Sequence, residues 1–93
     1  MEFSAELRVT MAETVLAQRV GDEMVLLDMS DEMYLGLNDT AALMWEQLAA
    51  GKTAGEAVAA VLAEYDVDEA TVQADLVALV EDLLSRKLVS AAA

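Results

Sequence analysis

The pattern of apolar and polar residues between positions 26 and 38 predicts two short strands joined by a polar turn. Met33, Leu35 and Leu37 recur at every second residue, which is the period of a strand that buries one face. Acidic residues and a serine are frequent in positions 28–32, and such residues favour tight turns. We therefore expect a β-hairpin that runs directly into the first helix, and we place the functional surface at this junction.

Earlier positions add further short strands to this hairpin. Residues 7–11 alternate in the same way, and residues 15–20 form a second strand-like run that ends at Gly21. Glycine followed by aspartate is a plausible hairpin turn, so residues 23–27 are expected to return antiparallel to 15–20. The result is an antiparallel sheet of three or four short strands, which needs a packing partner because so small a sheet is unstable alone.

Helical periodicity replaces the strand pattern after residue 38 and predicts three helices. The first covers about residues 39–49, where apolar positions recur at helical spacing around Trp45, which we expect to anchor the core. The second opens at Thr53-Ala54-Gly55-Glu56, a capping box in which the threonine and glutamate side chains each bind a free backbone N–H. Asp68 is a suitable cap for the third and longest helix, over about residues 69–87.

The third helix carries more apolar residues than one buried stripe requires. They are Val72, Leu76, Val77, Leu79, Val80, Leu83 and Leu84. One interpretation is that this helix contacts the core on one side and lines a groove beside the sheet on another. The other is that the wide face packs against both earlier helices, and the sequence favours neither. Residues 88–89 are expected to pack back on the core, with residues 90–93 as a loose tail.

These elements define one α+β domain that spans residues 1–93, with a core from about residue 7 to residue 89. Three or four strands followed by three helices predict a winged helix-turn-helix arrangement, and most such domains bind DNA. The third helix, however, carries Glu69, Asp75 and Glu81, which the DNA backbone would repel. The net charge of −13 extends this argument to nucleic acids and anionic membranes in general, and it favours basic partners.

The composition removes most catalytic chemistry. The 93 residues include no cysteine and no histidine, so thiolate nucleophiles, disulfides, histidine bases and the commonest metal ligands are all absent. The acidic residues at positions 28, 31, 32 and 39 lack the spacing of a calcium loop, and we interpret them as solvated turn residues. We therefore expect a protein that is not an enzyme and has no catalytic residue, metal or cofactor.

The chain is also expected to be a soluble, cytoplasmic protein. Its longest purely apolar run, residues 57–63, is far shorter than the ~20 residues that a membrane-spanning helix needs. The first six residues lack the basic start and the long apolar segment of a secretory signal. The absence of cysteine fits a reducing compartment.

A set of short motifs runs through most of the chain. These motifs are Leu26-Leu27-Asp28, Met33-Tyr34, Gly36-Leu37-Asn38, Thr40-Ala41, Trp45, Leu48, Gly51-Lys52-Thr53, Asp75, Leu79, Leu83 and Leu88-Val89. Their order and spacing resemble the PqqD-like proteins, and more closely the stand-alone leader-binding proteins of lasso-peptide biosynthesis. The resemblance covers about residues 15–89. It implies a RiPP recognition element, a small domain that captures the leader segment of a ribosomally synthesised precursor peptide.

The resemblance also implies where the leader binds. In the family, the leader adds as an antiparallel strand to the third strand of the sheet and lies against the third helix. Carried onto this chain, the strand edge comprises Glu32, Met33, Tyr34, Leu35 and Gly36, and the helix wall comprises Val72, Asp75, Leu76, Leu79, Val80 and Leu83. Leaders of the lasso class usually bear a Tyr-x-x-Pro motif, whose apolar side chains would fill the cleft.

Three functions are compatible with these observations. The first is a leader-binding protein that hands the precursor to a separate leader-cleaving cysteine protease in lasso-peptide biosynthesis. The second is the role of PqqD itself, a peptide chaperone that presents a precursor to a radical SAM enzyme. The third is an acidic regulatory subunit that docks helix to helix through the broad face of the third helix. Binding of a leader peptide separates the first two from the third.

Overall fold

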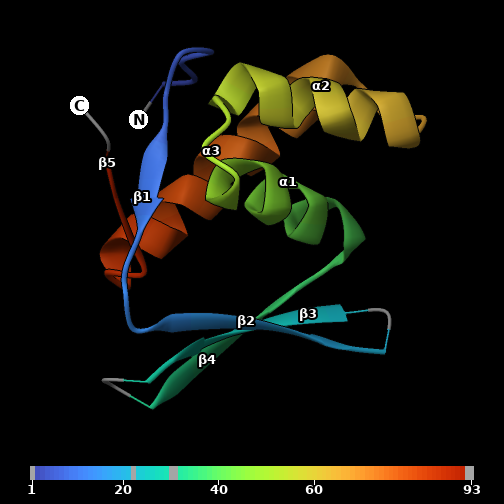
Figure 1. Ribbon diagram of the computed structural model, residues 1–93. Coiled ribbons are helices and arrows are strands. Elements are labelled where there is room, and N and C mark those ends of the chain that lie inside the picture. Colours follow the sequence, from blue (N-terminus) through green and yellow to red (C-terminus); the bar gives the residue numbers. More distant parts are fainter. Residues whose placement is uncertain (1, 22, 30–31, 92–93) are drawn as a thin grey trace.

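The computed structural model describes residues 2–21, 23–29 and 32–91, which form five short strands and three helices. In chain order these are β1 (Val9–Met11), β2 (Val15–Val20), β3 (Glu23–Asp28), β4 (Met33–Leu37), α1 (Asp39–Ala49), α2 (Ala54–Glu64), α3 (Glu69–Ser85) and β5 (Val89–Ala91). The predicted α+β fold, with antiparallel strands followed by three helices, is confirmed. Figure 1 shows the three helices gathered on one side of the sheet that contains β2, β3 and β4.

The strands divide into two separate pairings. One is an antiparallel sheet in the order β2-β3-β4, with Leu26 of β3 aligned with Ala17 of β2 and with Leu35 of β4. The other is a two-stranded ladder in which β1 pairs with β5. The main sheet therefore has three strands, and the strand predicted near residues 7–11 belongs to the second ladder instead.

The expectation of a loose tail is wrong for Ser90 and Ala91, which lie in β5 opposite Thr10 and Val9. A short run of small residues carries no periodicity, so only the backbone pairing with β1 identifies this strand. The ladder continues beyond β5, because the Ala12 N–H donates to the Leu88 carbonyl oxygen at 2.9 Å. The end of α3 is thereby tied to the segment that enters β2. Residues 92–93 of the expected tail lie outside the described part of the chain.

The core lies between the helices and the inner face of the sheet. Its largest fully buried side chains are Leu26, Met44, Leu48, Val61, Leu76, Val80 and Leu83. Trp45 is only 4% exposed, which confirms the prediction that it anchors the core. None of the helices within residues 2–21, 23–29 and 32–91 is long and apolar enough to cross a membrane.

The helix starts follow the sequence closely. Asn38, Thr53 and Asp68 are the N-caps of α1, α2 and α3, and each side chain accepts a hydrogen bond from a backbone N–H three residues later. The third helix ends at Ser85 rather than near residue 87. Lys87 adopts a left-handed conformation with φ of 60°, and the next N–H, that of Leu88, returns to the Leu83 carbonyl oxygen at 3.0 Å.

The N-terminal segment completes the start of α2. The N–H groups of Ala54 and Gly55 donate to the carbonyl oxygens of Leu7 and Ala5 at 2.8 and 2.9 Å. A side chain on Gly55 would lie 3.1 Å from Ala5, so the glycine permits this close approach. Residues 5–7 therefore form a strap, and the strap satisfies two backbone donors that the capping box leaves free.

The capping box makes the stability of α2 sensitive to acid. Hydrogen bonds from the Thr53 backbone N–H and hydroxyl hold the pKa of the Glu56 carboxyl below its ordinary value of 4.5. The unfolded chain lacks these bonds, so the stabilisation is present above pH ~4.5 and is lost as the pH falls through the lower, folded pKa. We expect Glu56→Gln to be less stable than the wild type at neutral pH, with the difference shrinking under acid. Urea unfolding of both proteins at several pH values measures it, and a difference that is constant with pH would contradict the prediction.

Candidate functional site

The outer edge of β4 is the first candidate for a functional surface. This strand pairs with β3 on one side, and no strand within the described ranges pairs with it on the other. An unpaired edge presents a row of backbone donors and acceptors that can hydrogen-bond to another chain. The edge predicted from the sequence is therefore open in the structure.

The register of the sheet identifies which backbone groups face that edge. The Met29 N–H donates to the Thr14 carbonyl oxygen at 2.9 Å, so these opposed residues form a hydrogen-bonded pair. Opposed residues of antiparallel strands alternate between hydrogen-bonded and non-hydrogen-bonded pairs. The alternation directs the backbone groups of Leu26 towards β4, and those of its partner Leu35 towards β3. The residues on either side of Leu35, Tyr34 and Gly36, direct their N–H and C=O groups to the open edge.

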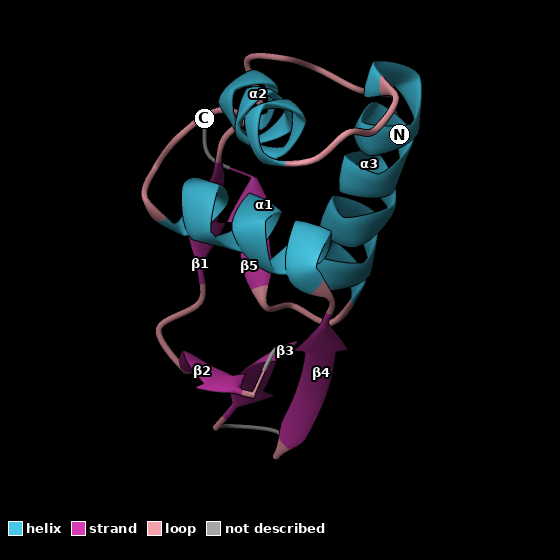
Figure 2. Ribbon diagram, turned by 90° about the vertical axis from the view of Figure 1, so that its right-hand side faces the viewer, coloured by secondary structure: helices cyan, strands magenta, loops and turns pink. Residues whose placement is uncertain are grey.

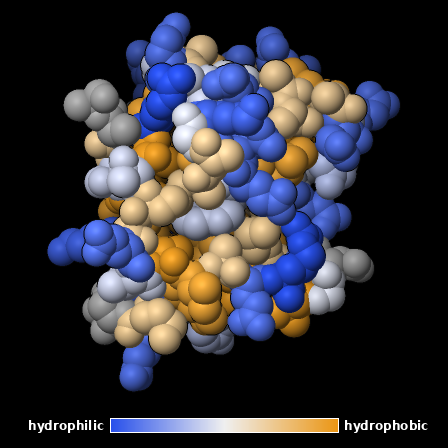
Figure 3. Space-filling view, viewed as in Figure 1, coloured by the Kyte–Doolittle hydropathy of each residue, from blue (hydrophilic) through white to orange (hydrophobic). Residues whose placement is uncertain are grey.

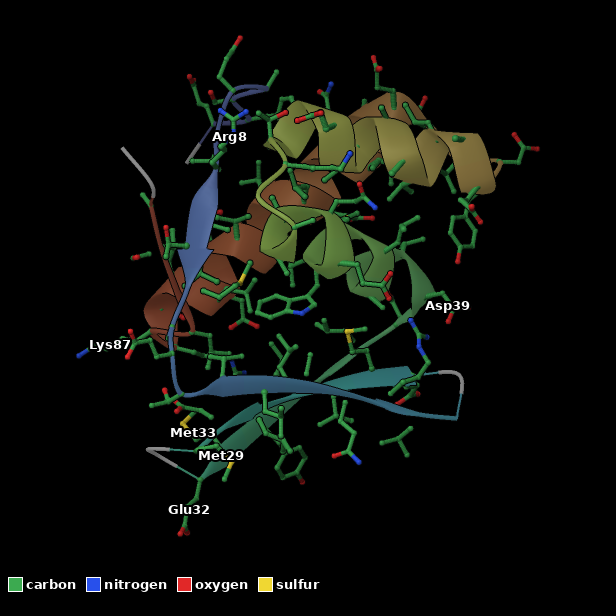
Figure 4. All side chains as sticks on the ribbon, in the orientation of Figure 1. Arg8, Met29, Glu32, Met33, Asp39 and Lys87 are labelled. Atoms are coloured by element: carbon green, nitrogen blue, oxygen red, sulfur yellow. The ribbon has the colours of Figure 1, made fainter. Side chains whose placement is uncertain are left out.

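The side chains of β4 divide between two faces. Leu35 and Leu37 point towards the helices, and their burial increases along the strand until Leu37 belongs to the core. Met33 lies on the same face but is 40% exposed, which differs from the expectation that all three residues are covered. Figure 4 shows Met33 near Met29 and Glu32, at the end of the sheet where β3 turns into β4.

The face of the sheet turned away from the helices carries an apolar surface that the sequence analysis did not identify. Leu16, Leu27 and Tyr34 form one row across the three strands, in which Tyr34 is 74% and Leu16 51% exposed. Val20 and Met29 extend this surface at opposite ends of the sheet. Figure 3 shows hydrophobic side chains at the surface in the lower part of the molecule, where the sheet lies. The sequence of β2 already indicates this surface. Leu16 and Val20 are an even number of residues apart, so their side chains lie on the same face of the strand.

Helix α3 supplies the other predicted wall of the site, and most of that wall is core. Val72, Leu76, Val80 and Leu83 are all buried at 3% exposure or less. Of the six predicted wall residues, only Asp75, which is exposed, and Leu79, which is half-buried, offer surface to another molecule. The packing therefore favours the interpretation that the wide apolar face of α3 contacts the other helices.

Asp75 and Leu79 belong to a flank of α3 that continues at Asp82 and Arg86, because these positions are three or four residues apart. The Arg86 Nε donates to the Asp82 carboxylate at 2.9 Å, which places an ion pair at the end of this flank. Gln73, on the opposite flank, lines a hollow against α2. The Asp75–Arg86 flank therefore faces away from α2. In Figure 2, α3 and β4 lie on the same side of the molecule, with β2 on the other.

The turn between β3 and β4 differs from the solvated turn that we expected. Asp28 is the last residue of β3 and is 5% exposed, with its carboxylate accepting a hydrogen bond from the Thr14 hydroxyl at 3.1 Å. Its interpretation as a solvated turn residue is therefore wrong. Glu32 is exposed and has φ of 55°, so it belongs to the turn rather than to the extended edge. Asp31 lies outside the described residues.

Acidic groups outnumber basic groups on this protein. Eighteen acidic residues face five basic ones in the chain. Three of the five basic side chains are already engaged: Arg19 pairs with Glu46 at 2.7 Å, Arg86 pairs with Asp82, and Arg8 donates to the Gly51 carbonyl oxygen at 3.0 Å. Most of the acidic surface therefore has no internal counter-charge and attracts basic molecules.

Two hollows in the described part of the surface lie away from the β4 edge. One is bounded by β2, α1 and the C-terminal end of α2, and includes the Arg19–Glu46 ion pair. The other lies between α2, α3 and the N-terminal segment, with Phe3 and Leu62 in its lining. Neither contains a residue of β4. Strand pairing at the β4 edge and ligand binding in either hollow would therefore involve different residues.

Known proteins resemble this chain over most of its length. The chain matches the family described as Coenzyme PQQ synthesis protein D (PqqD) over residues 23–89. It also resembles the solved structure of TbiB1 in complex with the TbiA(beta) leader peptide, with 33% sequence identity, coverage of 90% of this chain and 98% of that chain, and a TM-score of 0.80. A structure of lasso peptide synthetase B1 complexed with the leader peptide is 30% identical, with coverage of 91% and 98% and a TM-score of 0.77. Among curated proteins, none matches the chain.

Proposed function

The chain belongs to the PqqD family, and on that basis we propose that it is a RiPP recognition element that binds the leader of a precursor peptide in lasso-peptide biosynthesis. The observation that carries the proposal is the open edge of β4, on a domain that is 33% identical to a protein solved with a leader peptide. In this role the protein binds its ligand without changing it covalently. The leader adds to β4 as a fourth, antiparallel strand.

The backbone contacts of this strand follow from the register. Tyr34 and Gly36 each offer one outward N–H and one outward C=O, so the leader residues opposite them form the hydrogen-bonded pairs. Side chains of the leader alternate between the two faces of the extended sheet. Those on the inner face lie beside Met33 and Leu35, and they meet Leu79 and Asp75 on the flank of α3. The other predicted wall residues support this flank from the core.

The leader that fits this edge carries the Tyr-x-x-Pro motif of lasso leaders. Proline has no N–H and is tolerated in a strand only where that group would not be hydrogen-bonded to a neighbour. Leader residues opposite Met33, Leu35 and Leu37 occupy such positions, because the backbone groups of these three residues face β3. The motif's proline therefore takes a position opposite Met33 or Leu35.

After binding, the protein delivers the precursor to a separate leader-cleaving cysteine protease. The short edge of β4 supports this division of labour, since it holds a segment of only a few residues and leaves the rest of the precursor accessible to an enzyme. The chain has neither cysteine nor histidine with which to cleave the leader itself.

Titration of a fluorescently labelled leader against the protein tests the proposal. The probe is the synthetic leader of the precursor encoded beside the gene for this chain, and anisotropy is the measurement. We expect submillimolar binding that weakens about tenfold between 50 and 500 mM salt when the leader is basic, because the acidic surface then accelerates association only at low ionic strength. A scrambled leader of the same composition is the matched control. Equal binding of both peptides would mean that charge alone attracts them, and this result would refute strand addition.

A further inference from the structure

The outer face of the main sheet, which is turned away from the helices, carries far less charge than the rest of the chain. Nine described positions share this face, and they are Leu16, Gln18, Val20, Glu23, Val25, Leu27, Met29, Tyr34 and Gly36. Only Glu23 among them is charged, whereas charged residues make up 25% of the chain. Contiguous apolar surface of this kind on a protein without membrane-spanning segments marks an interaction site.

The size of the outer face is close to one side of a protein–protein interface. Its four most exposed apolar side chains together offer roughly 500 Å² to another molecule. They are Leu16, Val20, Met29 and Tyr34, with exposed fractions of 51%, 57%, 67% and 74%. With its remaining positions, the face comes near the ~800 Å² that each partner contributes to a stable complex. It is therefore large enough to hold a complex of moderate affinity by itself.

The arrangement of side chains on this face fits a second copy of the same chain. The central row reads Leu16, Leu27 and Tyr34 across the three strands. If two such faces stack about a two-fold axis parallel to the strands, the order of the row is reversed in the second copy. Tyr34 of each copy then lies over Leu16 of the other, and the two Leu27 side chains meet at the axis. The largest side chain of the row therefore faces a smaller one, which lets the two faces approach closely.

The charge of the outer face also favours a second copy over other partners. A basic protein would be attracted by acidic groups at the contact, yet only one of the nine positions is acidic. An anionic membrane would be repelled by the net charge of −13. Two copies bring no like charges into the centre of the contact, because Glu23 lies at the end of β3. Their net charges still repel each other at long range, so salt should strengthen the association.

We propose that the protein forms a homodimer in which the outer faces of the two sheets stack. Because the helices of each copy lie on the other side of its sheet, they form the outside of the dimer (Figure 1). Stacking leaves both β4 edges at the sides of the contact, so each copy keeps its candidate leader site. The inference goes beyond the proposed function, since the contact forms without a leader.

Sedimentation equilibrium of the protein alone tests the dimer. We expect a 9.9 kDa monomer in equilibrium with a dimer, with a dissociation constant of roughly 100 μM or less. Leu16→Glu and Val20→Lys should each weaken dimerisation at least about tenfold, because stacking would bury the new charge. The two variants change the net charge in opposite directions, so a loss in both identifies the contact itself. Val67→Glu is the matched control, since Val67 is 41% exposed between α2 and α3, and it should dimerise as the wild type does.

Salt provides a second test of the same dimer. Raising the salt concentration from about 50 to 500 mM should strengthen dimerisation roughly threefold or more, the reverse of the effect expected for a basic leader. A wild type that remains monomeric at about 1 mM protein in high salt would overturn the proposal and assign the outer face to another partner or to water. Equal losses in Leu16→Glu and Val67→Glu would also overturn it. Circular dichroism verifies the fold of each variant, and leader titration shows separately whether the proposed function holds.

Discussion

Leu79→Asp is expected to weaken leader binding by about tenfold or more while the protein still unfolds cooperatively at a similar temperature. Leu79 is half-buried on the flank of α3 that faces away from α2, so the folded protein can hold an aspartate there with its carboxylate in water. A bound leader would bring apolar side chains over this position and remove that water, which disfavours the charge. Leader titration measures the affinity, and thermal unfolding monitored by circular dichroism verifies the fold.

Leu76→Asp provides the contrast. Leu76 is 1% exposed, only three residues away on the same helix, and its replacement buries an unpaired carboxylate. This should remove more than about 4 kcal/mol from a free energy of unfolding that is roughly 5 to 10 kcal/mol for a domain of this size, so the variant should be much less stable than Leu79→Asp and unfold at a far lower temperature. If both variants remained folded and lost affinity together, α3 would present a broader face to the leader than its packing indicates.

Two proline substitutions in neighbouring positions of β4 should have opposite consequences. Tyr34→Pro removes an N–H that faces the open edge and places a ring where the leader backbone must approach. We expect it to fold and to bind the leader at least about tenfold more weakly. Titration of the same labelled leader measures the effect. Tyr34→Val, which keeps the N–H, separates the backbone contribution from the loss of the aromatic ring.

Leu35→Pro should instead damage the fold. The Leu35 N–H faces β3 and pairs with Leu26, so its removal breaks the β3–β4 ladder at its centre. The expected loss is about 2 to 4 kcal/mol of stability, which urea unfolding measures. If a Leu35→Pro protein were fully stable but did not bind the leader, our assignment of the backbone directions would be wrong. The N–H and C=O groups of Met33 and Leu35, rather than those of Tyr34 and Gly36, would then face the open edge and bind the leader.

Local chemistry made much of this fold predictable. The N-caps Asn38, Thr53 and Asp68 fix where the helices begin, because each side chain satisfies a backbone donor of its own helix. The hairpins could be predicted for the same reason, since residue types that favour turns, at position 21 and within positions 28–32, separate runs with strand periodicity. β5 could not be predicted, because its pairing joins residues about 80 positions apart and depends on backbone groups that every sequence shares.

The candidate site was less accessible from the sequence. The edge at Tyr34 and Gly36 was inferred from a family resemblance, and the structure adds which of its backbone groups are free. The division of α3 into core and flank depends on how three helices pack together, and the spacing of Leu76 and Leu79 on one apolar face does not reveal it. The outer surface around Leu16 was not predicted, because a strand pattern was taken to indicate one apolar face, covered by the helices. In this sheet the other face carries apolar side chains as well.

The strap formed by residues 5–7 bears on how this module can be transplanted into other proteins. The family match begins at residue 23, but a piece excised at that point would lose the carbonyl groups of Ala5 and Leu7 that hold the first turn of α2. It would also lose β2, so β3 would become a second unpaired edge strand, which could pair with other molecules and cause aggregation. A domain transferred into another protein therefore has to begin before Ala5. If it begins later, the backbone amides of α2 should exchange their hydrogens more rapidly than in the intact protein.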